Sequence, residues 1–289
     1  MSNFGKSQEG SNTLLVITSI YQSLTRTEQK IADIISQDPE MVVYGTLTDL
    51  AEKAGVGDTS VLRLCRKLGF KGYQEFKLSL AQDLVNPVKS VHSEIEEGDD
   101  LATIASKITA ENKAFLENTL ALLDMRELQK TMEAIEKANK IYFIGVGSSA
   151  NTAADAKYRF MRLGFNSELV TDSHVMAMTA MLMTKQDVVF AVSTSGSTKD
   201  LVDTVRLAKQ NGVFFVCLTS HAKSPITQYA DAVLLSCSKE NPLQGGAFRS
   251  KITQIHVLDI LTTAMAMHCK EKAYQAIELT SKAVSDKLY

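Results

Sequence analysis

Two loops rich in hydroxyl side chains follow apolar runs in the second half of this sequence, and their residue types suit the binding of an anion. Apolar residues 141–144 precede the loop Gly145–Ala150, and residues 188–192 precede the loop Ser193–Thr198; a helical pattern follows each loop. The start of a helix offers unpaired N–H groups and the positive end of the helix dipole. Two such loops in one parallel sheet are therefore expected to hold one phosphorylated ligand between them.

The second loop carries more hydroxyls than the start of a helix needs. Ser193, Ser195, Ser197 and Thr198 fall within six residues, and Gly196 lets the backbone approach a ligand. Ordinary capping of a helix by serine or threonine remains the alternative for either loop alone. The expected ligand-binding residues are Ser148, Ser149, Ser193, Ser195 and Thr198, with Glu240 as a charged contact from a later segment.

The first loop also matches a dinucleotide-binding pattern. Gly145, Gly147 and Ala150 have the spacing G-x-G-x-x-G/A, and Glu168 or Asp172 lies near the distance at which an acidic residue binds a ribose. This pattern predicts a nucleotide-dependent dehydrogenase, but it leaves the second loop unexplained. We keep it as a third hypothesis and expect no cofactor.

The first third of the sequence predicts two short helices joined by a glycine turn. Apolar residues recur at helical spacing in Thr46–Ala54 and in Thr59–Leu68, on either side of the turn Gly55–Gly57. This arrangement is typical of a helix-turn-helix, whose second helix enters the major groove of DNA. A solvated basic face on a small helical domain is the alternative. The expected DNA-binding residues are Thr59, Ser60, Arg63, Arg66, Lys67, Lys71 and Lys77.

Composition sets limits on the class of protein. A chain of 289 residues with 45% hydrophobic residues has room for two globular domains, and its net charge of −2 gives it no overall basic field. The first twelve residues lack the apolar stretch of a signal peptide, and no apolar run has the length of a membrane span. We therefore expect a cytoplasmic protein without a membrane partner. No metal motif or disulfide framework is expected from the widely spaced cysteines, which are Cys65, Cys217, Cys237 and Cys269.

Alternating strands and helices in the second half predict an α/β fold with a parallel sheet. The predicted strands are 141–146, 167–171, 187–193, 213–218 and 232–236, and the helices between them are 149–163, 174–184 and 198–211. Two further helices, 101–123 and 125–138, precede the sheet. The predicted domains are an all-helical DNA-binding domain at 1–85, a linker and helical connector at 86–124, and a ligand-binding domain at 125–289.

The two hydroxyl-rich loops resemble those of the sugar isomerase (SIS) domain. The S-x-S-G-x-T pattern of that family is matched by Ser193, Ser195, Gly196 and Thr198, and its first-loop hydroxyls by Ser148 and Ser149. The resemblance covers about residues 125–270. It implies a five-stranded parallel sheet, with helices on both faces, that binds phosphosugars. Because SIS domains occur both in enzymes and in regulators, this fold leaves the function open.

Residues 12–84 resemble the N-terminal domain of RpiR-type bacterial transcription regulators. The resemblance rests on Leu50-Ala51, Gly55-Val56, Ser60-Val61, Arg63, Arg66–Phe70, Gly72-Tyr73 and Phe76-Lys77. That family joins this domain to a C-terminal SIS domain, in the order found here. The resemblance implies a transcription regulator whose partners are operator DNA and a phosphosugar effector, and we expect a homodimer or homotetramer. The end of the chain resembles regulators of N-acetylmuramic acid use, which implies N-acetylmuramate 6-phosphate as the effector.

A phosphosugar isomerase or lyase with an N-terminal accessory domain is the main alternative. An aldose–ketose isomerase needs a base, often Glu or His, to move a proton between adjacent carbons. The candidates in this sequence are Glu168, His174, His221, Glu240 and His256, and no two of them form an identifiable catalytic pair. We therefore expect a regulator with no catalytic residue.

Overall fold

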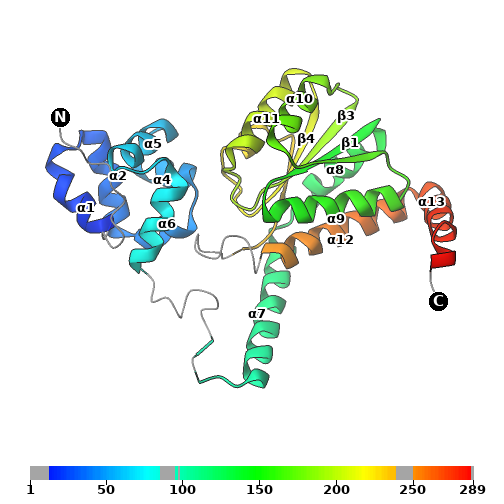
Figure 1. Ribbon diagram of the computed structural model, residues 1–289, viewed down its shortest axis with the longest axis horizontal. Coiled ribbons are helices and arrows are strands. Elements are labelled where there is room, and N and C mark those ends of the chain that lie inside the picture. Colours follow the sequence, from blue (N-terminus) through cyan, green and yellow to red (C-terminus); the bar gives the residue numbers. More distant parts are fainter. Residues whose placement is uncertain (1–12, 85–94, 97, 239–249, 288–289) are drawn as a thin grey trace. The chain divides into compact units, whose positions relative to one another are not determined.

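The computed structural model describes residues 13–84, 95–96, 98–238 and 250–287. The described chain forms two compact units, with the division between Glu111 and Asn112. Figure 1 shows the first unit as a cluster of short helices and the second as a sheet flanked by longer helices. The expected order of an all-helical region followed by an α/β region is confirmed.

Six helices and a 3₁₀ turn at Tyr21–Ser23 build most of the first unit. The helices are α1 (Thr13–Ile20), α2 (Arg26–Gln37), α3 (Pro39–Tyr44), α4 (Leu47–Ala54), α5 (Asp58–Lys67) and α6 (Tyr73–Leu84). Side-chain caps fix several of the helix starts. At the start of α2, Thr25 Oγ1 accepts from the backbone N–H of Glu28 at 3.3 Å, and Glu28 Oε2 accepts from that of Thr25 at 2.8 Å. One apolar core holds the helices together, and Ile31, Leu50, Leu64 and Phe76 are fully buried in it.

The turn between α4 and α5 has the geometry of a helix-turn-helix. Gly55 ends α4 with φ of 64°, a left-handed conformation that glycine adopts without strain. Gly57 precedes α5 in an extended conformation. The chain therefore reverses within three residues, as expected from the glycine pattern.

The second unit contains five parallel strands in the order β2-β1-β3-β4-β5. The strands are β1 (Lys140–Gly145), β2 (Ser167–Val170), β3 (Asp187–Val192), β4 (Phe214–Thr219) and β5 (Ala232–Leu235). The helices of this unit are α8 (Met125–Lys137), α9 (Ser148–Arg162), α10 (Ser173–Leu182), α11 (Lys199–Gln210), α12 (Ser250–His268) and α13 (Lys270–Lys282). Short 3₁₀ turns lie at Thr227–Tyr229 and Ser285–Lys287. The predicted five-stranded parallel sheet is confirmed.

Helices cover both faces of this sheet. On one face α8, α9 and α12 pack over Phe143 and Phe190, and on the other α10 and α11 pack over Val189 and Phe215. All six residues of β3 are buried, which is typical of a central strand in a parallel sheet covered on both sides. The loops at the strand ends are therefore held on a rigid framework.

The helix α7 (Leu101–Leu122) contains the division between the two units. In its second half, Phe115 and Thr119 are buried. The hydroxyl of Thr119 accepts from the backbone N–H of Cys237, just after β5, at 3.0 Å. This bond ties the end of α7 to the sheet, while the domain boundaries at 85 and 124 remain predictions. None of the helices within the described residues is long and apolar enough to cross a membrane.

Candidate functional sites

The two hydroxyl-rich loops start side by side at one edge of the sheet. β1 and β3 are neighbours, and their last residues, Gly145 and Val192, are register partners. From β1 the chain passes through α9 to β2, and from β3 it passes through α11 to β4 on the other side. A point where the strand order reverses in this way is where open α/β sheets bind ligands, beyond the carboxyl ends of the strands.

The first loop brings the start of α9 close to the end of β1. A Cβ at Gly145 would lie 2.8 Å from the carbonyl oxygen of Ser149, so only glycine permits this approach. Gly147 precedes α9 with φ of 60° and has no side chain to cap the helix. Ser148 is half-buried and Ser149 is buried, both in the first turn of α9. Among the described residues, no capping side chain therefore competes with an anion for the first N–H groups of α9.

In the second loop, Ser193 holds a buried hydroxyl without a partner. The residue is 2% exposed, and its Oγ has no hydrogen-bond partner among the described residues. Its backbone is fixed, because its N–H donates to the carbonyl of Leu218 at 3.0 Å. A buried polar atom left without a partner costs about 1–3 kcal/mol, so such atoms often mark a site that a ligand or water completes.

Ser195 and Thr198 are half-buried in the same loop. The Oγ of Ser195 accepts from the backbone N–H of Ser197 at 3.3 Å, and the hydroxyl of Ser197 donates to the carbonyl of Ser195 at 3.1 Å. Thr198 is the residue preceding α11, yet its side chain makes no capping hydrogen bond. Its hydroxyl therefore does not cap the helix, although capping is the usual role of a threonine at this position and was the alternative to ligand binding.

The start of α10 provides a contrast within the same sheet. Asp172 Oδ1 accepts from the backbone N–H groups of His174 and Val175, both at 3.0 Å. This carboxylate is occupied as a helix cap, and the carboxylate of Glu168 forms an ion pair with Lys140. Both candidates for the acidic residue that the dinucleotide hypothesis needs for a ribose therefore have other partners.

A buried glutamine joins the second loop to two helices. Gln254 of α12 is 1% exposed, and its Nε2 donates to the hydroxyl of Thr194 at 2.9 Å. Its Oε1 accepts from the hydroxyl of Thr152 in α9 at 3.0 Å. Gln254 was not among the predicted site residues, although a glutamine among the apolar residues of a predicted helix was a usable signal. The predicted ligand contact Glu240 lies outside the described residues.

Helix α5 separates a core face from an outward face, as the sequence predicts. Val61, Leu64 and Cys65 are buried in the core of the unit. Burial raises the pKa of the Cys65 thiol to about 12, so this residue is an apolar filler. On the outward face, Thr59, Arg63 and Arg66 are exposed and Ser60 is half-buried; Lys71, after the helix, is also exposed. Neither arginine forms an ion pair with another residue of the described chain.

Two of the predicted DNA contacts have partners inside the unit. Lys67 Nζ donates to Glu28 Oε2 at 2.9 Å and to the carbonyl of Ser23 at 3.0 Å, which ties the end of α5 to α2. Lys77 is 7% exposed, and its Nζ donates to the carbonyl of Gly45 at 2.7 Å. The expectation that Lys77 contacts a DNA phosphate is therefore wrong, because its ammonium is buried beneath the end of α3. Sequence spacing could not separate it from the exposed lysines.

Comparison with known proteins assigns the family. Two family models match the chain, the helix-turn-helix domain of the rpiR family at residues 11–87 and the SIS domain at residues 134–264. An HTH-type transcriptional regulator of Haemophilus influenzae is 39% identical over 94% of this chain and 96% of its own length. The chain belongs to the RpiR family of transcription regulators. Another relative, the HTH-type transcriptional regulator YbbH of Bacillus subtilis, is 30% identical over 94% of this chain and 96% of its own.

Solved structures match the regulator over one or both of its domains. The NanR protein of Vibrio vulnificus, solved in complex with ManNAc-6P, has 30% sequence identity and a TM-score of 0.85, and the match covers 96% of this chain and 99% of that one. The sugar isomerase domain of an RpiR transcription factor from Sphaerobacter thermophilus has 22% identity and a TM-score of 0.57, over 62% of this chain and 98% of its own. The second match supports the fold of the sheet alone.

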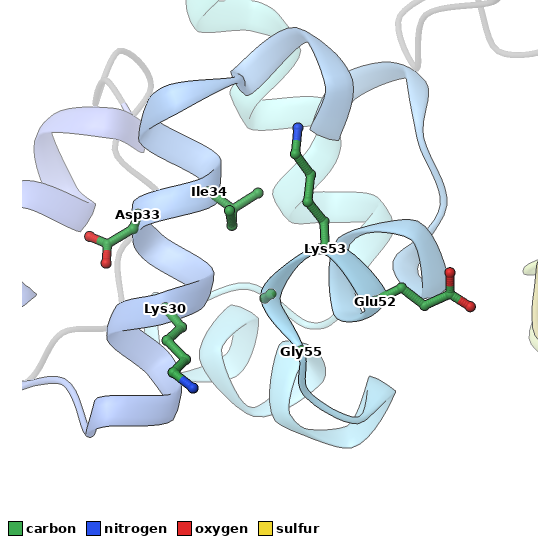
Figure 2. Close-up of a pocket in the computed structure, with 7 residues that line it drawn as sticks. Lys30, Asp33, Ile34, Glu52, Lys53 and Gly55 are labelled. Atoms are coloured by element: carbon green, nitrogen blue, oxygen red, sulfur yellow. The ribbon is translucent and has the colours of Figure 1, made fainter.

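The DNA-binding unit of the regulator also contains a hollow of about 370 Å³ between α2 and α4 (Figure 2). In Figure 2, Lys30, Asp33 and Ile34 come from α2 and Glu52 and Lys53 from α4; Ile34 points toward α4, whereas Asp33 and Glu52 point away from the space between the helices. Asp33 accepts from the hydroxyl of Tyr21 at 2.8 Å, and Lys53 forms an ion pair with Asp38 at 2.9 Å. None of the residues that line this hollow is among the predicted ligand-binding residues.

Proposed function

We propose that this regulator binds operator DNA through α5 and that a phosphosugar, bound where β1 and β3 end, changes its affinity for that DNA. The observation that carries the proposal is the Ser193 hydroxyl, which has no partner among the described residues and lies in the loop that leads to α11. Neither α11 nor α9, which follows the neighbouring strand β1, has a side-chain cap at its first residue. An anionic ligand satisfies the hydroxyl and both helix starts at once. The phosphate is assigned to the loop Ser193–Thr198, with Ser148 and Ser149 contacting the sugar or sharing the phosphate.

For the effector we propose an N-acetylated amino sugar 6-phosphate. NanR was solved with ManNAc-6P, and the end of this chain resembles regulators of N-acetylmuramic acid use, which points to N-acetylmuramate 6-phosphate. Both compounds combine a 6-phosphate with an N-acetyl group. The class of N-acetylated amino sugar 6-phosphates is therefore better supported as the effector than either of these two compounds.

On DNA, the exposed face of α5 is assigned to the major groove. Arg63 and Arg66 are exposed and without ion pairs in the described chain, so they have donors available for base edges or phosphates. A symmetric homodimer or homotetramer places two such helices on half-sites about one helical turn apart, or multiples of it. We place this activity in the cytoplasm, where a bacterial operator is found.

We further propose that the regulator has no isomerase or lyase activity. Of the candidate bases, Glu168 is paired with Lys140 and His174 is an exposed residue in the first turn of α10. Incubation with sugar phosphates distinguishes the two functions. Binding without turnover supports a regulator, and conversion of the added sugar contradicts this part of the proposal.

The decisive experiment measures DNA and effector binding in one preparation. An operator is first selected from a random DNA library, and its affinity is measured by fluorescence anisotropy with and without each sugar phosphate. By linkage, DNA must change the affinity for the effector by the factor by which the effector changes the affinity for DNA. An unphosphorylated sugar that acts as strongly as its phosphate would overturn the assignment of the anion to the two helix starts.

A further inference from the structure

Three side chains with metal-binding donor atoms meet where α12 ends. Glu136 lies in the last turn of α8, His268 is the last residue of α12, and Cys269 precedes α13. Their donor atoms all lie within 4.8 Å of one another, and His268 Nε2 is 3.0 Å from Glu136 Oε2. His268 follows Gln254 by 14 positions in the same helix, so the cluster lies about 21 Å from the effector loops along α12.

We propose that Glu136, His268 and Cys269 bind one divalent cation of the zinc class. Imidazole nitrogen, thiolate sulfur and carboxylate oxygen are the three donor types that zinc takes in proteins, at about 2.0–2.3 Å. Tetrahedral coordination at those lengths places the donor atoms about 3.3–3.6 Å apart. The observed 3.0 Å between His268 Nε2 and Glu136 Oε2, a hydrogen-bond contact without metal, is close to this spacing, and the thiol sulfur lies within 4.8 Å of both atoms.

The surroundings leave the three donors free to rearrange. Glu136 and His268 are exposed, and the side chain of Cys269 makes no hydrogen bond as a cap of α13. Because Glu136 and His268 are exposed, water can reach the cluster and serve as a fourth ligand. The site is thus of the open kind, with three protein ligands, rather than the closed kind with four.

Two charged side chains, Glu136 and Lys272, interact electrostatically with the Cys269 thiol. Lys272 Nζ lies 3.8 Å from the centre of the Phe165 ring, so this ammonium is held over an aromatic face.

Metal binding would join three helices of the second unit at one point. The cation would hold the end of α8 against the junction of α12 and α13. Ala273 is the one residue of α13 that is buried within the described chain, so burial alone fixes this helix at a single position. A ligand that binds the folded state alone stabilises it, so the melting temperature should rise with metal concentration.

The test is a cobalt titration of the full-length protein, kept reduced and free of other metals. Co²⁺ replaces zinc and gives a thiolate-to-cobalt absorption band when a cysteine is bound. We expect one cobalt per chain with this band, and its displacement by Zn²⁺. The variants Cys269→Ser and His268→Ala should each lose the band or weaken cobalt binding at least tenfold.

Matched controls use residues of the same type elsewhere in the unit. Cys237→Ser removes another partly buried thiol, and His174→Ala removes another exposed imidazole; both should keep the band and the affinity. Melting temperatures without metal check that each variant is folded. The proposal is overturned if cobalt gives no thiolate band, or if the band survives in Cys269→Ser or at full affinity in His268→Ala.

Discussion

Replacement of Ser193 by alanine should separate the binding of the effector from the stability of the fold. The Ser193 hydroxyl is buried and has no hydrogen-bond partner in the described chain, so without a ligand it contributes an unmet polar atom to the interior. Removing it takes away that penalty. Most substitutions in a binding loop would instead be expected to leave stability unchanged or lower it.

The substitution is expected to raise the stability of the unliganded protein and to lower its affinity for the effector. An unsatisfied buried hydroxyl costs about 1–3 kcal/mol, so unliganded Ser193→Ala should be at least as stable as the wild type, with a gain of up to about 1 kcal/mol once the small void is counted. A hydrogen bond to a charged phosphate oxygen is worth about 1.5–3 kcal/mol. Its loss should weaken effector binding roughly 10- to 150-fold.

Isothermal titration calorimetry with a sugar 6-phosphate and thermal melting without ligand measure the two effects separately. Thr204→Val is a matched control, since Thr204 is 2% exposed and its hydroxyl donates to the carbonyl of Asp200 at 2.7 Å. Thr204→Val loses this hydrogen bond to Asp200, and its affinity for the effector should stay unchanged. A Ser193→Ala protein that melts several degrees earlier yet binds the effector normally would show that the hydroxyl has a structural role, and would refute the reasoning.

Three further substitutions test other parts of the structure. Arg63→Ala should cost about 1–3 kcal/mol at the selected operator and relax its sequence preference in competition binding; wild-type affinity would exclude α5 as the reading helix. Burial lowers the pKa of Lys77 to about 8. Below pH 8 the buried ammonium therefore destabilises the folded state by its full amount, and this destabilisation decreases as the pH rises toward 10.5, the ordinary pKa of lysine. In denaturant titrations the wild type should therefore gain up to about 3 kcal/mol relative to Lys77→Met between pH 7 and 10.5, and a constant difference would contradict the burial of the charge. Gly196→Ala places a Cβ 2.1 Å from Ser224 Oγ at a φ of 60°, so it should lower both melting temperature and effector affinity; normal values for both would mean that the loop is not rigid.

The sequence predicted the sheet well because the signals were local and strong. Each strand is a short apolar run that ends at glycine or hydroxyl residues, and the strands alternate with helical patterns. All five predicted strands begin and end within one residue of the observed strands. The glycines at 55 and 147 were equally informative, since both adopt positive φ at turns. Local pattern and fold agree throughout this part of the chain.

What the sequence could not predict depends on contacts between distant positions. The buried Lys77 donates a hydrogen bond to the carbonyl of Gly45, 32 positions earlier, and the hydrogen bond from Thr152 to Gln254 spans 102 positions. The contact between Glu136 and His268 spans 132 positions. In each case the side chain type was visible, but its partner was fixed only by how the helices pack.

The loop that holds the predicted phosphate site is connected to the rest of its unit through the residue that follows Ser193. The carbonyl of Thr194 accepts from the backbone N–H of Ser220 at 3.1 Å, and its hydroxyl accepts from Gln254 at 2.9 Å. A phosphate that draws Ser193 and Ser195 inward therefore acts on a segment already bonded to β4 and α12. α12 is rigid, because Val257, Leu258, Leu261 and Met265 fix it in the core. An effector changes DNA affinity only if its contacts differ between two states of the protein. If the bound phosphate shifts the loop, the hydrogen bond between Thr194 and Gln254 must either move α12 with it or break, so this bond links the predicted effector site to α12.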